Sequence, residues 1–347
     1  MKNYFFTSES VTEGHPDKLC DNIADKILNE CMKQDKMSRV AVEVMAAKDT
    51  IYVAGQITTN AKIDIEKIVR NHLKEVGYDN ENLDIDYRTC KVLINITKQS
   101  NDISAIVGNK GAGDQGTVFG YACNETEELM PLPIMVAKDL TNRLTYVRKN
   151  DLIKGLRPDG KTQVTVEYKD DKPVRIDYII VSTQHLKEKN IDELRKEIYE
   201  KVILESKYSN LIDEKTKIDI NKNGQFVIGG PLADTGVTGR KLMVDTYGAM
   251  AKHGGGAFSG KDLSKIDRSG AYMLRKVAKD IVQKGLADRC EIGASYAIGD
   301  ENPISIYLNT YGTNKIKEEE ILEVIKTEYD LSVSNLKQVC GNNSVGI

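Results

Sequence analysis

The stretch RVAVEVMAAKDTIYVAGQITT (39–59) decides the fold of this 347-residue chain. It contains two runs rich in β-branched residues, 39–47 and 50–59, on either side of Lys48 and Asp49. Two such runs around a short polar turn are typical of a β-hairpin, in which adjacent strands run antiparallel. We therefore predict a hairpin whose apolar face needs a covering layer.

The segments on both sides of this hairpin have helical periodicity. Before it, apolar residues from Leu19 to Cys31 lie on one helical face, and after it the same spacing runs from Ile65 to Leu73. A further strand-like run, CKVLINIT (90–97), closes the unit. This order of elements predicts a sheet with helices packed against one face.

The same order occurs three times along the chain. The second copy consists of helix 133–149, hairpin strands 162–168 and 174–183, helix 191–204, and closing strands in KIDIN and QFVIG within 217–229. The third consists of helix 266–284, hairpin strands 290–299 and 304–312, and helix 317–329. Successive hairpins are separated by about 120–130 residues, which is the size of a domain. We predict an α+β fold of three pseudo-symmetric repeats, each an antiparallel sheet with helices on one face.

The expected domain boundaries follow from these repeats. They are residues 1–100, residues 101–230 with the GAGDQG loop, and residues 231–347. We expect the third repeat to be truncated, because the chain after Leu331 turns polar and offers no closing strand.

Composition excludes several classes of protein. The 49 basic and 52 acidic residues give a net charge of −3, which argues against nucleic-acid binding driven by net charge. No apolar run approaches the ~20 residues of a membrane helix, and the N-terminus has no apolar core of a secretion signal. The six cysteines and four histidines form no zinc-binding pattern. We expect a cytoplasmic protein with reduced, buried cysteines.

A glycine-rich segment opens the first predicted helix. In GHPDK (14–18), Pro16 suits the first helical position, where its missing N–H costs nothing. Asp17 then lies in the first turn beside free backbone donors, with His15 next to it. A helix start of this kind can bind an anion, or it can be a capped helix end without a ligand.

Two further glycine-rich loops resemble nucleotide-binding motifs without their fold context. GAGDQG (111–116) matches G-x-G-x-x-G, but the strand-like TVFGYA follows it where a Rossmann fold needs a helix. Gly255 to Lys261 fits the start of a P-loop, but Asp262 stands where Ser or Thr should hold Mg²⁺. We predict neither fold, and we expect loops that bring Asp114 and Lys261 close to a ligand.

A fourth loop, GGPLADTGVTGRK (229–241), adds Arg240 and Lys241. Basic side chains on glycine-rich loops indicate a polyphosphate ligand, although solvated loop charges are the plainer alternative. Aspartates in the same segments could hold a divalent metal against such a ligand: Asp17, Asp114, Asp234, Asp262 and Asp267.

In this combination the motifs resemble one family, the S-adenosylmethionine synthases (methionine adenosyltransferases). The resemblance rests on FTSESVTEGHPDK (6–18), GAGDQGTVFGYACNET (111–126), LRPDGKTQV (156–164), FVIGGPLADTGVTGRK (226–241) and HGGGAFSGKDLSKIDRS (253–269). It covers nearly the whole chain, and the three-repeat architecture of the family agrees with the repeats above.

The resemblance implies a transferase in which the sulfur of L-methionine attacks C5′ of ATP. Tripolyphosphate leaves and is hydrolysed at the same site to pyrophosphate and phosphate. It also implies Mg²⁺ and K⁺ as cofactors, and a homodimer, or a tetramer built from two dimers, with active sites between subunits. A thioether needs no general base, so the expected work is orientation and stabilisation of the leaving group.

Residue roles carry over from the matching motifs. His15, Lys161 and Lys261 would be catalytic, with Asp17 and Asp267 at Mg²⁺ and Glu43 at K⁺. The remaining ATP contacts would come from Asp159, Gln225, Phe226, Asp234, Arg240, Lys241, Ala257 and Ile298. The methionine contacts would come from Gln56, Gln99, Asp114, Asp234 and Lys265.

The sequence departs from the family pattern in several places. Gln56 stands where the family usually has Glu facing the methionine ammonium, and Gln225 replaces an arginine. The segment 100–111 is short for the family's lid, and the family's stretch after the last helix is absent. These departures leave two alternatives open: a non-catalytic, ATP-binding or regulatory relative, and an enzyme that uses a methionine analogue.

Overall fold

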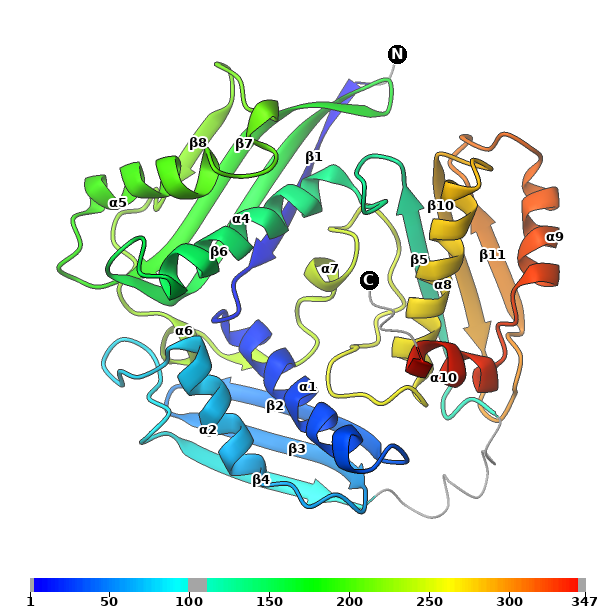
Figure 1. Cartoon of the computed structure of the whole chain (residues 1–347), viewed down its shortest axis with the longest axis horizontal. Coiled ribbons are helices and arrows are strands. Elements are labelled where there is room, and N and C mark those ends of the chain that lie inside the picture. Colours follow the sequence, from blue (N-terminus) through cyan, green and yellow to red (C-terminus); the bar gives the residue numbers. More distant parts are fainter. Residues whose placement is uncertain (1–2, 99–110, 343–347) are drawn as a thin grey trace.

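The computed structural model describes residues 3–98 and 111–342, and it contains three sheets in three lobes (Figure 1). The first sheet has the order β4-β3-β2-β9, and α1 and α2 cover one of its faces. Its elements are α1 (Pro16–Gln34), β2 (Arg39–Ala47), β3 (Thr50–Thr58), α2 (Ile65–Val76), β4 (Lys91–Thr97) and β9 (Gly236–Val237). Alternate residues of β2, from Val40 to Ala46, are buried under the helices. The predicted hairpin is therefore confirmed, with Ala47 paired to Thr50 across the turn.

The second sheet has the order β1-β6-β7-β8. Its elements are β1 (Asn3–Val11), α4 (Leu132–Lys149), β6 (Leu156–Lys169), β7 (Lys172–His185), α5 (Ile191–Ile198), a π-helical turn (Tyr199–Ile203), a 3₁₀ turn (Ser209–Leu211) and β8 (Lys217–Ile220). Buried residues of α4 and α5 pack against the strands in one apolar core.

The third sheet has the order β11-β10-β5 and packs against α8. Its elements are β5 (Gly116–Cys123), α8 (Ile266–Gln283), β10 (Arg289–Tyr296), β11 (Ser305–Asn309), α9 (Glu318–Glu328) and α10 (Val333–Asn342). The chain after Leu331 thus continues as a helix that packs against α8 through Val333 and Leu336. Two short helices, α6 (Gly230–Ala233) and α7 (Leu242–Asp245), lie in the connection from the second lobe to the third.

The α+β class with three helix-covered sheets is confirmed, but two details of the prediction are wrong. β4 pairs parallel to β3, and β8 pairs parallel to β7, so these two sheets are mixed and not purely antiparallel. The physical reason is the helix between each pair of strands, which returns the chain to the same end of the sheet before the next strand starts.

The second wrong detail is the closing strand in QFVIG (225–229), which the structure leaves as a loop. Two side chains form hydrogen bonds with backbone groups that would otherwise bond to a neighbouring strand. The N–H of Phe226 donates to Nε2 of His185, and the carbonyl of Val227 accepts from Gln184. The segment therefore bonds partly to side chains and partly to the single backbone groups of His185 and Leu83, and it forms no continuous strand pairing.

Each sheet takes a strand from a distant part of the chain. β1 pairs with β6 from Asn3 opposite Lys169 to Val11 opposite Lys161, β5 pairs with β10, and β9 pairs with β2. The first and second sheets therefore contain strands from both sides of residue 100, and the third contains strands from both sides of residue 230. Because β1 ends beside Lys161, the chain enters α1 next to the start of β6. Among the described residues, no helix is long and apolar enough to cross a membrane.

Candidate active site

His15 is the residue that caps α1. Its Nδ1 accepts the N–H of Asp17 at 3.2 Å, and Pro16 occupies the first helical position. The side chain is only 2% exposed. Burial, followed by the nearby charges of Lys241 and Lys161, lowers the pKa of His15 to about 3. The imidazole is therefore neutral at physiological pH, and because Nδ1 is an acceptor, the proton is on Nε2.

Asp17 lies two residues after His15, in the first turn of α1, and it accepts hydrogen bonds from the loop before α7. Its Oδ1 accepts the N–H of Val237 at 2.9 Å, and its Oδ2 lies 2.6 Å from Nζ of Lys241. Burial alone would raise the pKa of Asp17, but these hydrogen bonds outweigh it and hold the pKa below the usual value. A cation and a carboxylate thus stand together beside a neutral imidazole.

Two more aspartates continue this arrangement along α1. Asp17, Asp21 and Asp25 follow one another at four-residue spacing, so they lie on one side of the helix. The N–H groups of Val237, Gly239 and Gly260 donate to them in that order, each at 2.9 Å. This aspartate ladder holds two glycine-rich loops against α1. Our sequence reasoning missed Asp21 and Asp25, although their spacing on a predicted helix was visible.

The start of β6 and the loop before α6 supply the next group. Asp159 is buried, its Oδ2 accepts the N–H of Gly230 at 2.9 Å, and burial raises its pKa to about 6. Lys161, two residues on, has an exposed side chain. Phe226 is half-buried, and its neighbour Gln225 is exposed. The strand pairing of Val11 with Lys161 brings this group close to the start of α1.

Arg240 and Asp234 lie on the same loop as Lys241. The guanidinium of Arg240 donates to the carbonyl of Thr235 at 3.1 Å and lies 3.7 Å from Oδ1 of Asp17. Asp234 is exposed at the end of α6. This loop closely approaches the next glycine-rich loop, because a Cβ at Gly239 would lie 2.6 Å from the Cβ of Ala257.

Lys261 and Asp267 form a second charged pair, with Nζ and Oδ2 at 2.7 Å. Backbone hydrogen bonds hold the loop around Lys261 against β2: Val42 donates to Gly260, and Asp262 donates to Val40. Glu43 lies on the outer face of β2 nearby. Desolvation raises the pKa of Glu43, and the charge of Lys261 acts in the opposite direction.

Asp262 has a structural role that differs from the expected metal ligand. Its two carboxylate oxygens accept the N–H groups of Val40 and Ser264, at 2.7 and 2.8 Å. It also forms ion pairs with Arg39 and Lys265. No three His, Cys, Asp or Glu side chains of the described residues converge as a ready metal site. A divalent ion would therefore need oxygen ligands from its substrate as well.

Four further predicted residues, all in the described part of the chain, lie apart from the group around His15, Asp17 and Lys241. Gln56 is exposed on β3, opposite Ala41 of β2. Asp114 is exposed and accepts the N–H of Gln115. Ile298 is 55% exposed and bridges to Ala112. Lys265 caps α8, while Gln99 lies outside the described residues. In the described parts of the chain, no hydrogen bond or ion pair joins these residues to His15.

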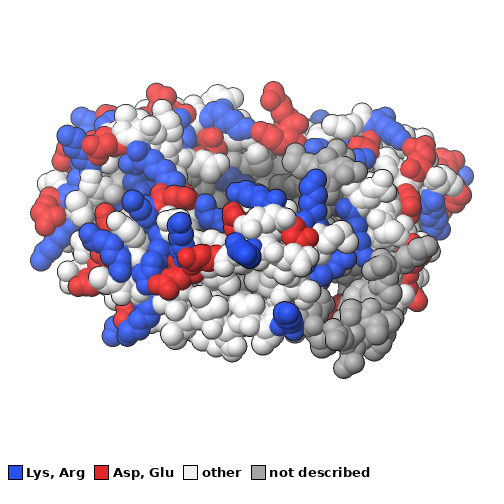
Figure 2. Space-filling view, turned by 60° about the horizontal axis from the view of Figure 1, so that its bottom comes forward, with Lys and Arg blue, Asp and Glu red and all other residues white. Residues whose placement is uncertain are grey.

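Charged side chains of both signs lie on one face of the molecule (Figure 2). Figure 2 shows Lys and Arg side chains across the middle of one face, with Asp and Glu side chains between them. Cations there are positioned to meet an anion, and the carboxylates beside them keep the local charge balanced.

Three family models match the chain in order. They are the N-terminal, central and C-terminal domains of S-adenosylmethionine synthetase, at residues 3–101, 109–226 and 228–341. The S-adenosylmethionine synthase of Finegoldia magna is 52% identical over 344 residues, covering 95% of this chain and 88% of the relative. The S-adenosylmethionine synthase of Brachyspira hyodysenteriae is 48% identical over 349 residues, covering 97% and 89%.

Proposed function

Because this chain belongs to the S-adenosylmethionine synthetase family, it is a methionine adenosyltransferase that forms S-adenosylmethionine from L-methionine and ATP, and we propose how its residues do so. The methionine sulfur attacks C5′ of ATP, the C5′–O bond breaks, and tripolyphosphate leaves. The same site then hydrolyses tripolyphosphate to pyrophosphate and phosphate.

The observation that carries this proposal is the neutral, buried His15, on which the charges of two nearby lysines act. Its Nε2–H is a fixed donor for the oxygen that leaves C5′, and it needs no proton transfer to act. Lys241 and Lys161, whose charges add to the effect of burial in keeping the imidazole neutral, would bind the phosphates. Donors already aimed at developing charge are usually the largest contribution to catalysis in such a site.

The phosphates would be bound by Lys161, Arg240, Lys241 and Lys261. Two of these lysines are paired with carboxylates, Lys241 with Asp17 and Lys261 with Asp267. A magnesium triphosphate would satisfy both members of each pair, since the lysines would bind phosphate oxygens and the aspartates would hold the metal. The site therefore holds its charges in place before substrate arrives, and little reorganisation is needed.

The donor set suits the two expected cations. Mg²⁺ is usually held by one or two carboxylates together with substrate phosphates. Asp17 and Asp267 would supply these two carboxylates. Asp17 stays ionised because its pKa is held low. When bound, Mg²⁺ supplies neutralisation of the phosphate charge. Glu43, beside Lys261, offers an oxygen ligand for K⁺.

The remaining roles concern the two organic groups. Phe226, half-buried between exposed Gln225 and buried Gly229, would stack on adenine, with Asp159, Asp234, Ala257 and Ile298 around the nucleotide. Gln56, Gln99, Asp114, Asp234 and Lys265 would contact methionine. Gln56 keeps a carbonyl acceptor for the substrate ammonium but lacks the charge of a carboxylate.

We propose a homodimer, with two dimers forming a tetramer, in which each active site takes residues from two subunits. The support is the uncovered face of the first sheet, where Glu43 and Gln56 lie beside exposed Met45 and Leu93. Seen from the side of this lobe, the lower middle of Figure 2 is a broad area almost without charged side chains. Apolar faces of this kind are typical of interfaces.

The deciding experiment is mass spectrometry of purified protein with ATP, L-methionine, Mg²⁺ and K⁺. We expect S-adenosylmethionine, pyrophosphate and phosphate in equal amounts. Phosphate without S-adenosylmethionine would mean that the methionine site is altered, and a panel of methionine analogues would follow. ATP binding without turnover would support the non-catalytic alternative.

A further inference from the structure

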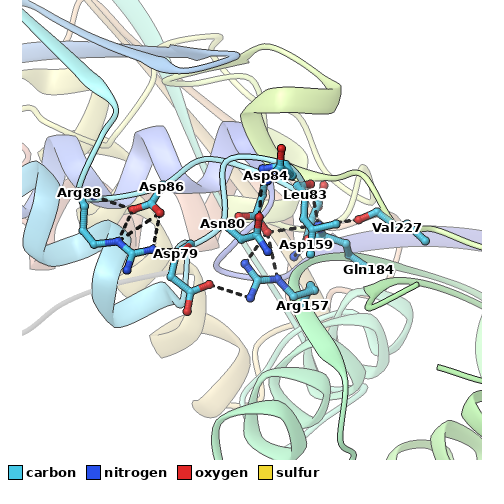
Figure 3. A network of polar contacts seen from close by, with 11 residues as sticks. Asp79, Asn80, Leu83, Asp84, Asp86, Arg88, Arg157, Asp159, Gln184 and Val227 are labelled. Atoms are coloured by element: carbon cyan, nitrogen blue, oxygen red, sulfur yellow. Dashed lines mark hydrogen bonds and ion pairs between the residues drawn. The ribbon is translucent and has the colours of Figure 1, made fainter. Parts of the chain in front are cut away.

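The side chain of Gln184, at the end of β7, joins three separate segments of the chain (Figure 3). It is fully buried. Its Nε2 lies 3.1 Å from the carbonyl oxygens of Leu83 and Val227, and 3.3 Å from Oδ2 of Asp84. Its Oε1 accepts the N–H of Asp159 at 3.4 Å. One amide therefore ties the first lobe, the start of β6 and the loop 225–229 together.

The next residue, His185, holds Phe226 from both sides of its peptide unit. The backbone N–H of His185 donates to the carbonyl of Phe226 at 2.9 Å, and Nε2 accepts the N–H of Phe226 at 3.0 Å. Nδ1 lies 2.8 Å from the carbonyl of Leu186. A ring that accepts at Nε2 and donates at Nδ1 is a single neutral tautomer. Phe226 is thus fixed through its backbone, which leaves the ring as the free part.

Gly229 shows how closely the loop packs on Gln184. A Cβ at Gly229 would lie 2.6 Å from Cδ and 2.8 Å from Oε1 of Gln184. The φ of Gly229 is −143°, which any residue adopts, so space and not conformation requires glycine here. Its N–H also donates to the carbonyl of Leu83, the acceptor that Gln184 uses.

A buried ion pair holds Asp84, one of the groups that Gln184 contacts. We refer to Gln184, His185 and the Arg157–Asp84 pair together as the clamp. Arg157 donates to Oδ2 of Asp84 at 2.6 Å and pairs with Asp79 at 2.8 Å. The carboxylate that Gln184 faces therefore cannot shift toward solvent without breaking a charged pair. Figure 3 shows these side chains converging from the 79–84 loop and from β6.

We propose that Gln184 and His185 are positioning residues for the nucleoside part of ATP. Together they hold the loop 225–229 so that the Phe226 ring faces the nucleotide, and they keep Asp159 in register with Gly230. The inference rests on the proposed function, in which Phe226 stacks on adenine. Three of the four cations for the phosphates, Arg240, Lys241 and Lys261, lie on other segments, and only Lys161 shares β6 with Asp159. We therefore expect the clamp to set affinity for the nucleoside far more than for the polyphosphate.

The test compares two ligands by isothermal titration in the presence of Mg²⁺: ATP, and tripolyphosphate in its imido-bridged form, which the site cannot hydrolyse during the titration. Four variants of the full-length protein are needed: Gln184→Ala, Gly229→Ala, the double variant, and Gln283→Ala as a control at an exposed glutamine. In Gln184→Ala and in Gly229→Ala we expect the Kd for ATP to rise about tenfold, while the Kd for tripolyphosphate stays within about twofold. The control should match the wild type for both ligands.

The double variant adds a second, independent criterion. Gln184→Ala removes the atoms that a Cβ at position 229 would meet, so the double variant should bind ATP as Gln184→Ala does. Equal losses for both ligands, no loss for either, or additive losses in the double variant would overturn the proposal. If Gln184→Ala does not fold, Gly229→Ala decides by the same ligand comparison. A wild type that binds tripolyphosphate but not ATP would instead refute the proposed function.

Discussion

Oδ2 of Asp17 lies 2.6 Å from Nζ of Lys241, although 224 positions separate the two residues in the chain. The pair lies near enough to His15 for both of its charges to act on the imidazole, and it is buried on the aspartate side. It joins the start of α1 to the loop before α7, so the helix end and the cationic loop form one unit. A magnesium triphosphate could bind to both members, with its phosphates at Lys241 and its metal at Asp17.

Removing the cation of this pair should have a large effect on turnover. We expect Lys241→Met to lower kcat by about 10²–10³, the usual cost of losing one preorganised charge-stabilising donor. Steady-state kinetics of S-adenosylmethionine formation measures it. Lys276→Met, on the partly exposed side of α8, is the matched control and should keep wild-type kcat. A Lys241→Met enzyme with unchanged kcat would remove Lys241 from the phosphate site.

His15 should make stability depend on pH between neutrality and acid. Its pKa of about 3 in the folded protein lies below the ordinary histidine value of 6.5, so below pH 6.5 the unfolded chain binds a proton that the folded protein does not. The contribution of the neutral, buried ring to the free energy of unfolding is therefore complete above pH 6.5, and it decreases as the pH falls. Relative to His15→Gln, the free energy of unfolding of the wild type should fall by up to about 1.4 kcal/mol per pH unit below 6.5.

Urea denaturation from pH 7 to pH 5 measures this difference. His72 is also buried, and burial lowers its pKa to about 4, so His72→Gln is the matched comparison for a histidine outside the site. Both variants should flatten the pH profile, but only His15→Gln should also lower kcat. Parallel profiles for the wild type and His15→Gln would show that His15 takes up a proton as readily in the folded protein as in the unfolded chain, which would contradict the lowered pKa.

Gln56 should limit the affinity for methionine. A hydrogen bond to a charged group is worth about 1.5–3 kcal/mol, and a carboxylate at this position would gain the attraction of the substrate ammonium. We expect Gln56→Glu to lower the KM for methionine by about tenfold or more with little change in kcat. The same change at exposed Gln283 is the control. An unchanged or higher KM in Gln56→Glu would contradict the assigned contact.

The aspartate ladder should couple stability to the position of Lys261. Asp25 accepts the N–H of Gly260 at 2.9 Å and forms an ion pair with Arg268 at 2.7 Å. Asp25→Ala leaves both donors without this acceptor, so we expect a loss of about 1–3 kcal/mol in the free energy of unfolding. It should also lower kcat, because the loop that carries Lys261 is released.

Asp25→Asn separates the two effects, since the amide oxygen can still accept the N–H of Gly260 but loses the charge facing Arg268. We expect it to keep more activity than Asp25→Ala. Urea denaturation and steady-state kinetics on the three proteins test this order. Full activity in Asp25→Ala would mean that the 258–262 loop keeps its place through its backbone pairing with β2 alone.

Local pattern was sufficient for most elements of the fold. The runs 39–47 and 50–59 became β2 and β3 within one residue, because alternating buried positions and a two-residue turn are short-range properties. Pro16 and His15 marked the start of α1 for the same reason, since a helix end is decided by neighbours in sequence. The three-repeat α+β class followed from the order of such elements.

The partners across long sequence separations were decided only by the tertiary structure. Nothing in residues 3–11 says that β1 pairs with β6, and nothing in QFVIG says that His185 and Gln184 take its hydrogen bonds. The same holds for Asp17 and Lys241. Backbone and charged groups must be satisfied once buried, but many partners in the chain could do so, and only the packed arrangement of the three lobes selects one of them.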